Sequence, residues 1–478
     1  MARWQRHARW ALAVIAIGVI GVVLYTIRPR ETAAPIAQPA GVEPGAVVTT
    51  LNGQAITFKG AHQDVRIDYE VQTTNAEQET KLRGVKIMVD NRAGRNYVVT
   101  GKEAFLGKQN SSFDVRGDVK LVTSDGLTVT SQQATYTDAE DLVRIPGDVK
   151  FSRGRMSGTG VGFTYDQQRD MMTILDKADV KFAAEGDQEA MAFTAGLFVY
   201  ARRDRYMRFE KTMHMDRESQ VIDSDQAMVR LFVDRDEPDY VELRNGAKVT
   251  GSGAASALKS MAARDINLDY ADDGRTLQNA TLVGKAEIQV ASQGAGGQTL
   301  AGESMDIGLE PDGSVRSLNA RDAVTVTLPA TKDTPARTIR STALTAAGTA
   351  QGLRDMHFSE GVEYREAGLK GQGGRTIRSK NLDASLDPAA GTLKEAHFLV
   401  NVDFSDSPLH AVGADARYMV DAGTLALSGV QPAPHLETDA LTIDATTIDV
   451  TLNPRKMMAK GSVRSTLGEA ARGSRAGR

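Results

Sequence analysis

The chain of 478 residues contains no cysteine. This absence excludes disulfide bonds, thiolate metal sites and a cysteine nucleophile together. Aromatic residues make up only 5% of the chain, and acids and bases are mixed throughout to give a net charge of -4. Because nucleic-acid-binding domains normally carry a basic patch, this balance does not indicate a nucleic-acid partner.

Motifs for catalysis and metal binding are also lacking. No two of the seven histidines have metal-ligand spacing, and there is no HExxH motif. The glycine-rich segment 158–162 does not match a phosphate-binding loop, and a strand kink or bulge explains it better. The acidic segment 234–239 lacks the spacing of a calcium loop and reads as a solvated turn. The sequence therefore gives no sign of an enzyme, a metal site or a cofactor.

One long hydrophobic run is present near the N-terminus. Residues Trp10 to Ile27 contain no charged side chain, and at about 1.5 Å per residue they cover about 27 Å, enough for the apolar core of a bilayer. Arg3, Arg6 and Arg9 precede the run, which favours a cytoplasmic N-terminus. Residues 28–30 read Arg-Pro-Arg instead of a small-residue cleavage site, so we expect an uncleaved single-pass anchor rather than a signal peptide.

Composition divides the rest of the chain. After the cytoplasmic stub and anchor (1–30), residues 31–49 are rich in Ala and Pro, which predicts a semi-extended tether. From about residue 55, short runs alternate apolar and polar residues, such as Phe113-Asp114-Val115 and Val119-Lys120-Leu121, with Gly, Asp and Asn between them. This pattern is typical of strands and turns. The segment 466–478, rich in Ala, Gly and Arg, is predicted to be disordered.

A short phrase recurs within the β-rich part. It reads Gly117-Asp118-Val119-Lys120-Leu121, then Gly147-Asp148-Val149-Lys150-Phe151, then Ala178-Asp179-Val180-Lys181-Phe182, with looser copies up to residue 464. Copies lie about 30 to 40 residues apart, a period that indicates stacked supersecondary units. We expect an all-β fold in which two facing antiparallel sheets grow along one axis, rather than a propeller or a parallel β-helix.

These phrases resemble the LptC, LptA and OstA superfamily of periplasmic lipopolysaccharide-transport proteins. The likeness is clearest over residues 50–185 of the predicted LptC-like domain (50–189), which contain GDVKLVTSDGLTVTSQQATYT and IPGDVKFSRGRMSGTGVGFTYD behind an LptC-like anchor. Residues 190–465 are similar in texture and are predicted to be further OstA- or LptA-like repeats. The chain is much longer than a usual LptC, which raises the question whether it also replaces part of a bridge of separate LptA subunits.

The resemblance implies an elongated, V-shaped antiparallel β-jellyroll (β-taco) of stacked repeats, preceded by one transmembrane helix. Its apolar groove would hold the acyl chains of lipopolysaccharide, received from the inner-membrane LptB-LptF-LptG transporter and passed toward the outer membrane. An LptA-like jellyroll would join by strand addition at an exposed sheet edge. The protein would be a single-pass inner-membrane protein with most of its chain in the periplasm, and would have no catalytic activity and no cofactor.

Two alternatives remain open at this stage. A structural or adhesive β-stalk without lipid cargo predicts a closed, dry core. A polysaccharide-processing enzyme would need clustered acids on one face of the stack.

Alternation within the matching segment gives the inward-facing side chains. These are candidates for lipid contact and equally for plain core packing, and an error of one residue in register would reverse a whole strand. The candidates are Phe113, Val115, Val119, Leu121, Leu127, Val129, Tyr136, Val149, Phe151, Phe163, Tyr165, Val180 and Phe182.

Overall fold

The computed structural model describes residues 46–467, apart from 60–61, 93, 108–111, 138–139, 187, 218–219, 234, 236, 252–257, 292–296, 332–333, 369–372 and 389–390. The expected anchor lies outside the described residues. None of the described residues forms a helix long and apolar enough to cross a membrane. The first strand begins at Ala46 and the last ends at Leu467, so residues 46–49 of the expected tether and 466–467 of the expected disordered segment are in strands.

The described part of the chain consists of β-strands joined by turns. The strands are β1 (Ala46–Lys59), β2 (His62–Asn75), β3 (Thr80–Arg92), β4 (Arg95–Leu106), β5 (Ser112–Thr123), β6 (Thr128–Thr137), β7 (Leu142–Arg153), β8 (Met156–Asp166), β9 (Met171–Phe182), β10 (Met191–Ala195), β11 (Leu197–Ala201), β12 (Tyr206–Arg217), β13 (Gln220–Leu231), β14 (Pro238–Thr250), β15 (Leu258–Tyr270), β16 (Leu277–Val290), β17 (Gln298–Leu309), β18 (Val315–Leu328), β19 (Arg337–Thr349), β20 (Gly352–Glu366), β21 (Arg375–Asp387), β22 (Thr392–Asp406), β23 (Leu409–Met419), β24 (Thr424–Ser428), β25 (His435–Glu437), β26 (Leu441–Asp444), β27 (Thr447–Leu452), β28 (Arg455–Lys460) and β29 (Arg464–Leu467).

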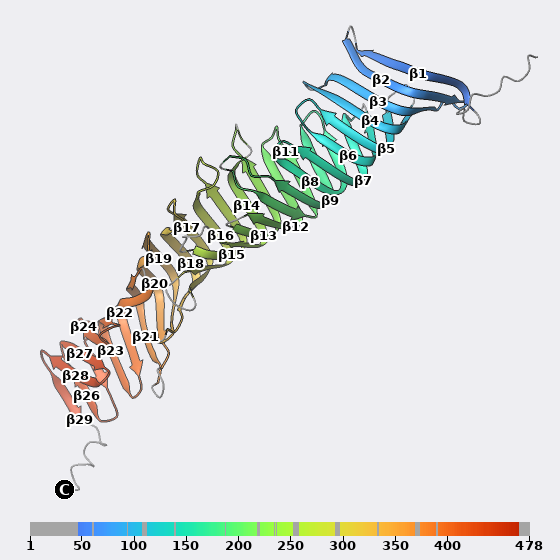
Figure 1. Ribbon diagram of the computed structural model, residues 1–478. Coiled ribbons are helices and arrows are strands. Elements are labelled where there is room, and N and C mark those ends of the chain that lie inside the picture. Colours follow the sequence, from blue (N-terminus) through green and yellow to red (C-terminus); the bar gives the residue numbers. More distant parts are fainter. Residues whose placement is uncertain are drawn as a thin grey trace, which may run out of the picture.

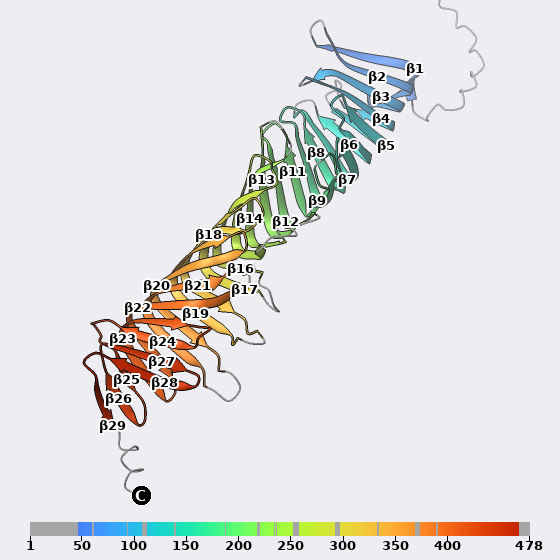
Figure 2. The ribbon, with the colours of Figure 1, turned by 60° about the vertical axis from the view of Figure 1, so that its left-hand side comes forward.

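The strands form one continuous antiparallel meander, which gives the molecule its elongated shape (Figures 1 and 2). Each strand from β1 to β9 pairs with the next, and β9 pairs with both β10 and β11, which in turn pair with β12. The meander then runs on to β23, where the sheet divides into a β24–β27–β28 branch and a β25–β26–β29 branch. Hydrogen bonding is therefore uninterrupted around residue 190.

Most long strands carry a bulge near their middle. The register shifts between Arg116 and Val119 in β5 and between Arg244 and Ala247 in β14, for example. Left-handed backbone occurs at these places, as at Asp118 (φ 47°) and Gly246 (φ 77°). An extra residue of this kind bends the strand and increases its twist.

The bulges correct one expectation. The Gly and Asp residues between the short apolar runs were interpreted as turns, but residues 113–115 and 119–121 belong to the same strand, β5. The physical reason is that a turn and a bulge both need residues that tolerate left-handed backbone, so the same residue types serve both.

The bends fold the bulged strands back on themselves, as β8 shows. Arg153 precedes β8 and Asp170 follows it, yet their side chains are 3.1 Å apart. A straight strand of that length would span about 36 Å, so the two ends of β8 must approach each other. The sheet therefore forms two facing walls that meet at the row of bulges, and the strand ends meet at the opposite side, which we call the mouth.

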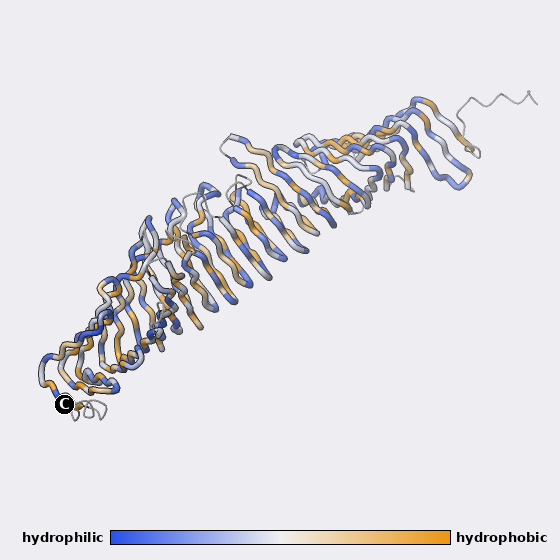
Figure 3. The backbone as a smooth tube through the Cα atoms, turned by 60° about the horizontal axis from the view of Figure 1, so that its bottom comes forward, coloured by the Kyte–Doolittle hydropathy of each residue, from blue (hydrophilic) through white to orange (hydrophobic). Residues whose placement is uncertain are grey.

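Two rows of turns border the mouth. The turns after β3, β5, β7, β9, β20 and β22 lie on what we call the first rim, and the turns after β6, β8, β11, β23 and β27 on the second rim. Polar and apolar residues alternate along the strands (Figure 3). The inward apolar side chains form one core from Val65 to Leu452, as expected for strands with one buried face.

Candidate functional site

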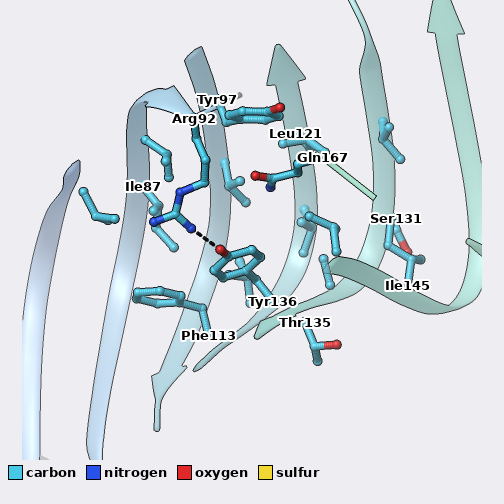
Figure 4. A pocket seen from close by; sticks show the side chains of 18 residues that line it. Ile87, Arg92, Tyr97, Phe113, Leu121, Ser131, Thr135, Tyr136, Ile145 and Gln167 are labelled. Atoms are coloured by element: carbon cyan, nitrogen blue, oxygen red, sulfur yellow. Dashed lines mark hydrogen bonds between the residues drawn. The ribbon is translucent and has the colours of Figure 1, made fainter. Parts of the chain in front are cut away.

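An apolar cavity of about 60 Å³ lies between the walls near the N-terminal end. It is bordered by strands β2 to β7 and by the β8–β9 turn (Figure 4). Its lining side chains are Val65, Ile87, Val89, Arg92, Tyr97, Val99, Phe113, Val115, Val119, Leu121, Val129, Ser131, Ala134, Thr135, Tyr136, Val143, Ile145 and Gln167. The valine-rich lining gives the cavity an apolar floor and walls.

Polar groups cover the side of the cavity at the mouth. Arg92 donates hydrogen bonds to Tyr136 Oη (Figure 4) and to Asp64 Oδ2, the latter at 2.8 Å. Tyr97 Oη and Gln167 Oε1 are buried and make no hydrogen bond among the described residues. Because a buried polar atom without a partner costs about 1–3 kcal/mol, these two atoms mark a place where a polar ligand group would be favourable. The cavity is thus apolar inside and polar at its mouth.

A cluster of ions joins the two rims beside this cavity. Arg95 Nη2 lies 2.6 Å from Asp170 Oδ2, and Arg95 Nε lies 2.8 Å from Asp125 Oδ2. Arg153 is paired with the same two aspartates, with Nη1 3.1 Å from Asp170 Oδ1. Tyr165 donates to Asp170 Oδ1 at 3.0 Å. We call these five residues the first ion cluster.

Burial and charge act together on the ionisable groups of this cluster. Burial opposes ionisation of Asp125, but a hydrogen bond from Thr123 and the positive charges of Arg153 and Arg95 outweigh it and lower the pKa of that carboxyl. Burial, with the nearby Asp170 charge, raises the pKa of Tyr165 well above its usual range. The tyrosine therefore stays a neutral hydrogen-bond donor and the aspartate stays an anion at neutral pH.

A second ion cluster occupies the mouth near the C-terminal end. Glu366 accepts from Arg337 Nε at 2.9 Å and from Arg375 Nη1 at 2.8 Å. Asp406 Oδ2 lies 3.2 Å from Arg375 Nε and 3.2 Å from Arg455 Nη2. Arg455 lies on the second rim and Asp406 on the first, so this cluster also links the rims.

Buried tyrosines take part here as well. Tyr364 donates to Glu366 at 2.8 Å, and Tyr418, at the end of β23, lies within hydrogen-bond distance of Arg375. Burial raises the pKa of both phenols. The second cluster therefore repeats the chemistry of the first.

The structure places the predicted inward residues inside the fold. Twelve of them are buried and Tyr136 is half-buried. Those that line the cavity are Phe113, Val115, Val119, Leu121, Val129 and Tyr136. Those that pack in the core away from it are Leu127, Val149, Phe151, Phe163, Tyr165, Val180 and Phe182. Contact of any of them with lipid stays a prediction.

Sequence reasoning missed the polar side of the cavity. Arg92, Tyr97 and Gln167 come from β3, β4 and the β8–β9 turn, and only the bending of the strands brings them together. The apolar residues of β2 and β3, such as Val65 and Ile87, could have been found, because they alternate with polar residues as those of β5 do.

Comparison with known protein families gives a match that covers the N-terminal part of the chain. Residues 13–183 match the family described as "Lipopolysaccharide-assembly, LptC-related". The matched range includes β1 to β9, and therefore the cavity strands and all five residues of the first ion cluster. A search of curated proteins found no match. Residues 13–183 are thus similar to an LptC-related family, whose members are transport and binding proteins rather than enzymes.

Proposed function

Because the part of the chain that holds the cavity is LptC-related, we propose that this protein carries lipopolysaccharide from the inner membrane toward the outer membrane. The observation that supports this proposal most directly is the apolar cavity with a polar mouth. Such a site suits a ligand with apolar chains and a polar head. In this proposal the acyl chains lie between the walls and the sugars project through the mouth.

Shielding of the acyl chains from water would supply the binding energy. Burial is worth about 0.8 kcal/mol per methylene, so a chain of about a dozen methylenes gains roughly 10 kcal/mol. The cavity of about 60 Å³ has room for only a few water molecules. Lipid entry therefore requires the two walls to move apart.

The length of the sheet suggests a role in the bridge between the membranes. The strands β12 to β23 lie beyond the family match and continue the same sheet. At about 4.8 Å per strand they lengthen the stack by roughly 55 Å. We propose that this extension takes the place of part of a separate LptA bridge.

The proposed partners sit at the two ends of the stack. The anchored N-terminal end would receive lipid from the ATP-driven LptB-LptF-LptG complex of the inner membrane. At the other end, Met458 and Leu467 are exposed on β28 and β29. An unpaired, partly apolar edge can be extended by a strand of another jellyroll, and an LptA-like protein is the proposed partner there.

Photocrosslinking tests lipid binding. A benzoylphenylalanine at Phe113, which lines the cavity, is expected to capture lipopolysaccharide in membranes that contain the transporter and ATP. The matched control is the same probe at Asp114, the next residue of β5, whose side chain bonds to Arg116 on the outer face. Equal capture at both positions, or capture at neither, would contradict the proposal.

A second candidate function rests on the packing of the C-terminal half. The inward side chains there are tightly buried, and Phe358 and Phe404 are both 0% exposed. A filled core is what a structural stalk without lipid would have. This candidate predicts that a probe at Phe358 never captures lipid, even when a probe at Phe113 does.

A further inference from the structure

The two ion clusters share a composition that plain core packing does not require. In the first, Arg95, Arg153 and the nearby Arg202 face the two carboxylates Asp125 and Asp170. The second likewise has three arginines and two carboxylates, Arg337, Arg375 and Arg455 with Glu366 and Asp406. With Arg202 counted beside the first cluster, each cluster has one more positive than negative charge. The positive excess favours an anion at the mouth.

The first cluster fastens the β8–β9 turn over the mouth. Asp170 lies in this turn on the second rim, whereas Arg95, Asp125 and Arg153 lie on the first rim. Gln167 belongs to the same turn and lines the cavity. Movement of Asp170 away from the arginines would therefore also lift Gln167 from the cavity.

Stability alone does not account for ions at this position. The side chains of Arg153 and Asp170 are only 9% and 6% exposed. A buried ion pair is often no more stabilising than well-packed apolar residues of the same volume. Unlike apolar contacts, however, the arginine of a buried ion pair can exchange its carboxylate partner for another anion.

We propose that the first ion cluster is a latch, in which the anionic phosphate of an acylated lipid head group replaces the Asp170 carboxylate at Arg95 and Arg153. A guanidinium group binds phosphate with the same two-pronged geometry as carboxylate. Tyr97 Oη and Gln167 Oε1, which accept or donate no hydrogen bond within the described part of the chain, lie beside the cavity to bind further polar groups of the head. Exchange releases the β8–β9 turn and opens the mouth above the acyl cavity.

This inference rests on the proposed function and specifies the head group that opens the site. The test uses the full chain in a nonionic detergent. The dissociation constant is measured by calorimetry for diphosphorylated lipid A and for the same lipid with its phosphates removed. The wild-type protein is expected to prefer the phosphorylated lipid at least tenfold.

Variants separate the latch from plain lipid binding. Arg153→Gln is expected to remove the preference while binding of the phosphate-free lipid persists, since the acyl cavity is unchanged. Asp170→Asn is expected to tighten binding of the phosphorylated lipid about tenfold, because the competing carboxylate is gone. Arg202 is half-exposed, so Arg202→Gln provides a second test in case Arg153→Gln does not fold. Arg202→Gln is expected to reduce the preference for the phosphorylated lipid about threefold.

Asp114→Asn removes a carboxylate paired with an arginine on the outer face, and should change neither constant. Equal affinity of the wild-type protein for both lipids, or equal weakening of both by Arg153→Gln and by Arg202→Gln, would overturn the latch and leave the proposed function standing. Binding of neither lipid would overturn both.

Discussion

At the scale of single residues, the inward side chains of the N-terminal part face two different surroundings. Phe163 is fully buried in packed core, whereas Phe113 borders the cavity. Both were predicted from the same alternation in sequence. The difference decides how much each side chain contributes to the stability of the fold.

Truncation of these two phenylalanines should therefore have unequal costs. Phe163→Ala is expected to lower the free energy of unfolding by about 3–5 kcal/mol, the usual cost of such a cavity in packed core. Phe113→Ala should cost clearly less, because its ring already borders empty space. Urea unfolding followed by circular dichroism measures both. Equal costs would mean that the cavity is packed as tightly as the core.

The pH dependence of stability should reveal Asp125. Its pKa is lower in the folded chain than the value of about 3.9 expected when unfolded. The ionised Asp125 therefore contributes fully to the free energy of unfolding above about pH 4. This contribution is lost as the pH falls through the pKa of the folded state. The difference in free energy of unfolding between wild type and Asp125→Asn should stay constant from pH 7 to about 5 and shrink below about 4. If the difference between wild type and Asp125→Asn disappeared already between pH 7 and 5, the lowered pKa of Asp125 would be contradicted.

Residue-scale prediction from the sequence succeeded where periodicity decides. Alternation is a local property, so it found the buried set that includes Val115 and Val129. It could not find Arg95 and Asp170, which meet across the mouth only after several strands have bent. Contacts of this kind depend on the path of the whole sheet.

At the scale of elements, bulges shape the molecule. Gly246 has a φ of 77° inside β14, while Gly147, in the corresponding phrase of β7, does not have left-handed backbone. A Cβ at either glycine would meet no atom within 4 Å. The two positions therefore differ in backbone conformation and not in available space.

This contrast gives a matched pair of substitutions. Gly246→Ala is expected to destabilise the protein by about 1 kcal/mol, the cost of left-handed backbone for a residue with a Cβ. Gly147→Ala should be neutral or slightly stabilising, because it restricts the unfolded chain. The shift of the thermal unfolding midpoint measures both. If Gly147→Ala lowered the unfolding midpoint more than Gly246→Ala does, the bend in β7 would also need glycine.

At the scale of the whole molecule, one sheet runs from β1 to β29. The sequence predicted an elongated all-β stack, because the repeated phrase indicates units that bury their apolar faces against one another. Whether the stack breaks near residue 190 could not be predicted, since it depends on the pairing of β9 with β10 and β11. That pairing joins the LptC-related part to the extension.

In the proposed function, lipopolysaccharide travels along the interior of this sheet. Time-resolved photocrosslinking from two inward positions, Phe113 near one end and Phe358 in the extension, tests it most directly. After ATP is added to membranes containing the transporter, capture is expected first at Phe113 and later at Phe358. Capture at Phe113 that is never followed by capture at Phe358, absence of lipid at both positions, or ATP-independent capture at both from the start would contradict this proposal.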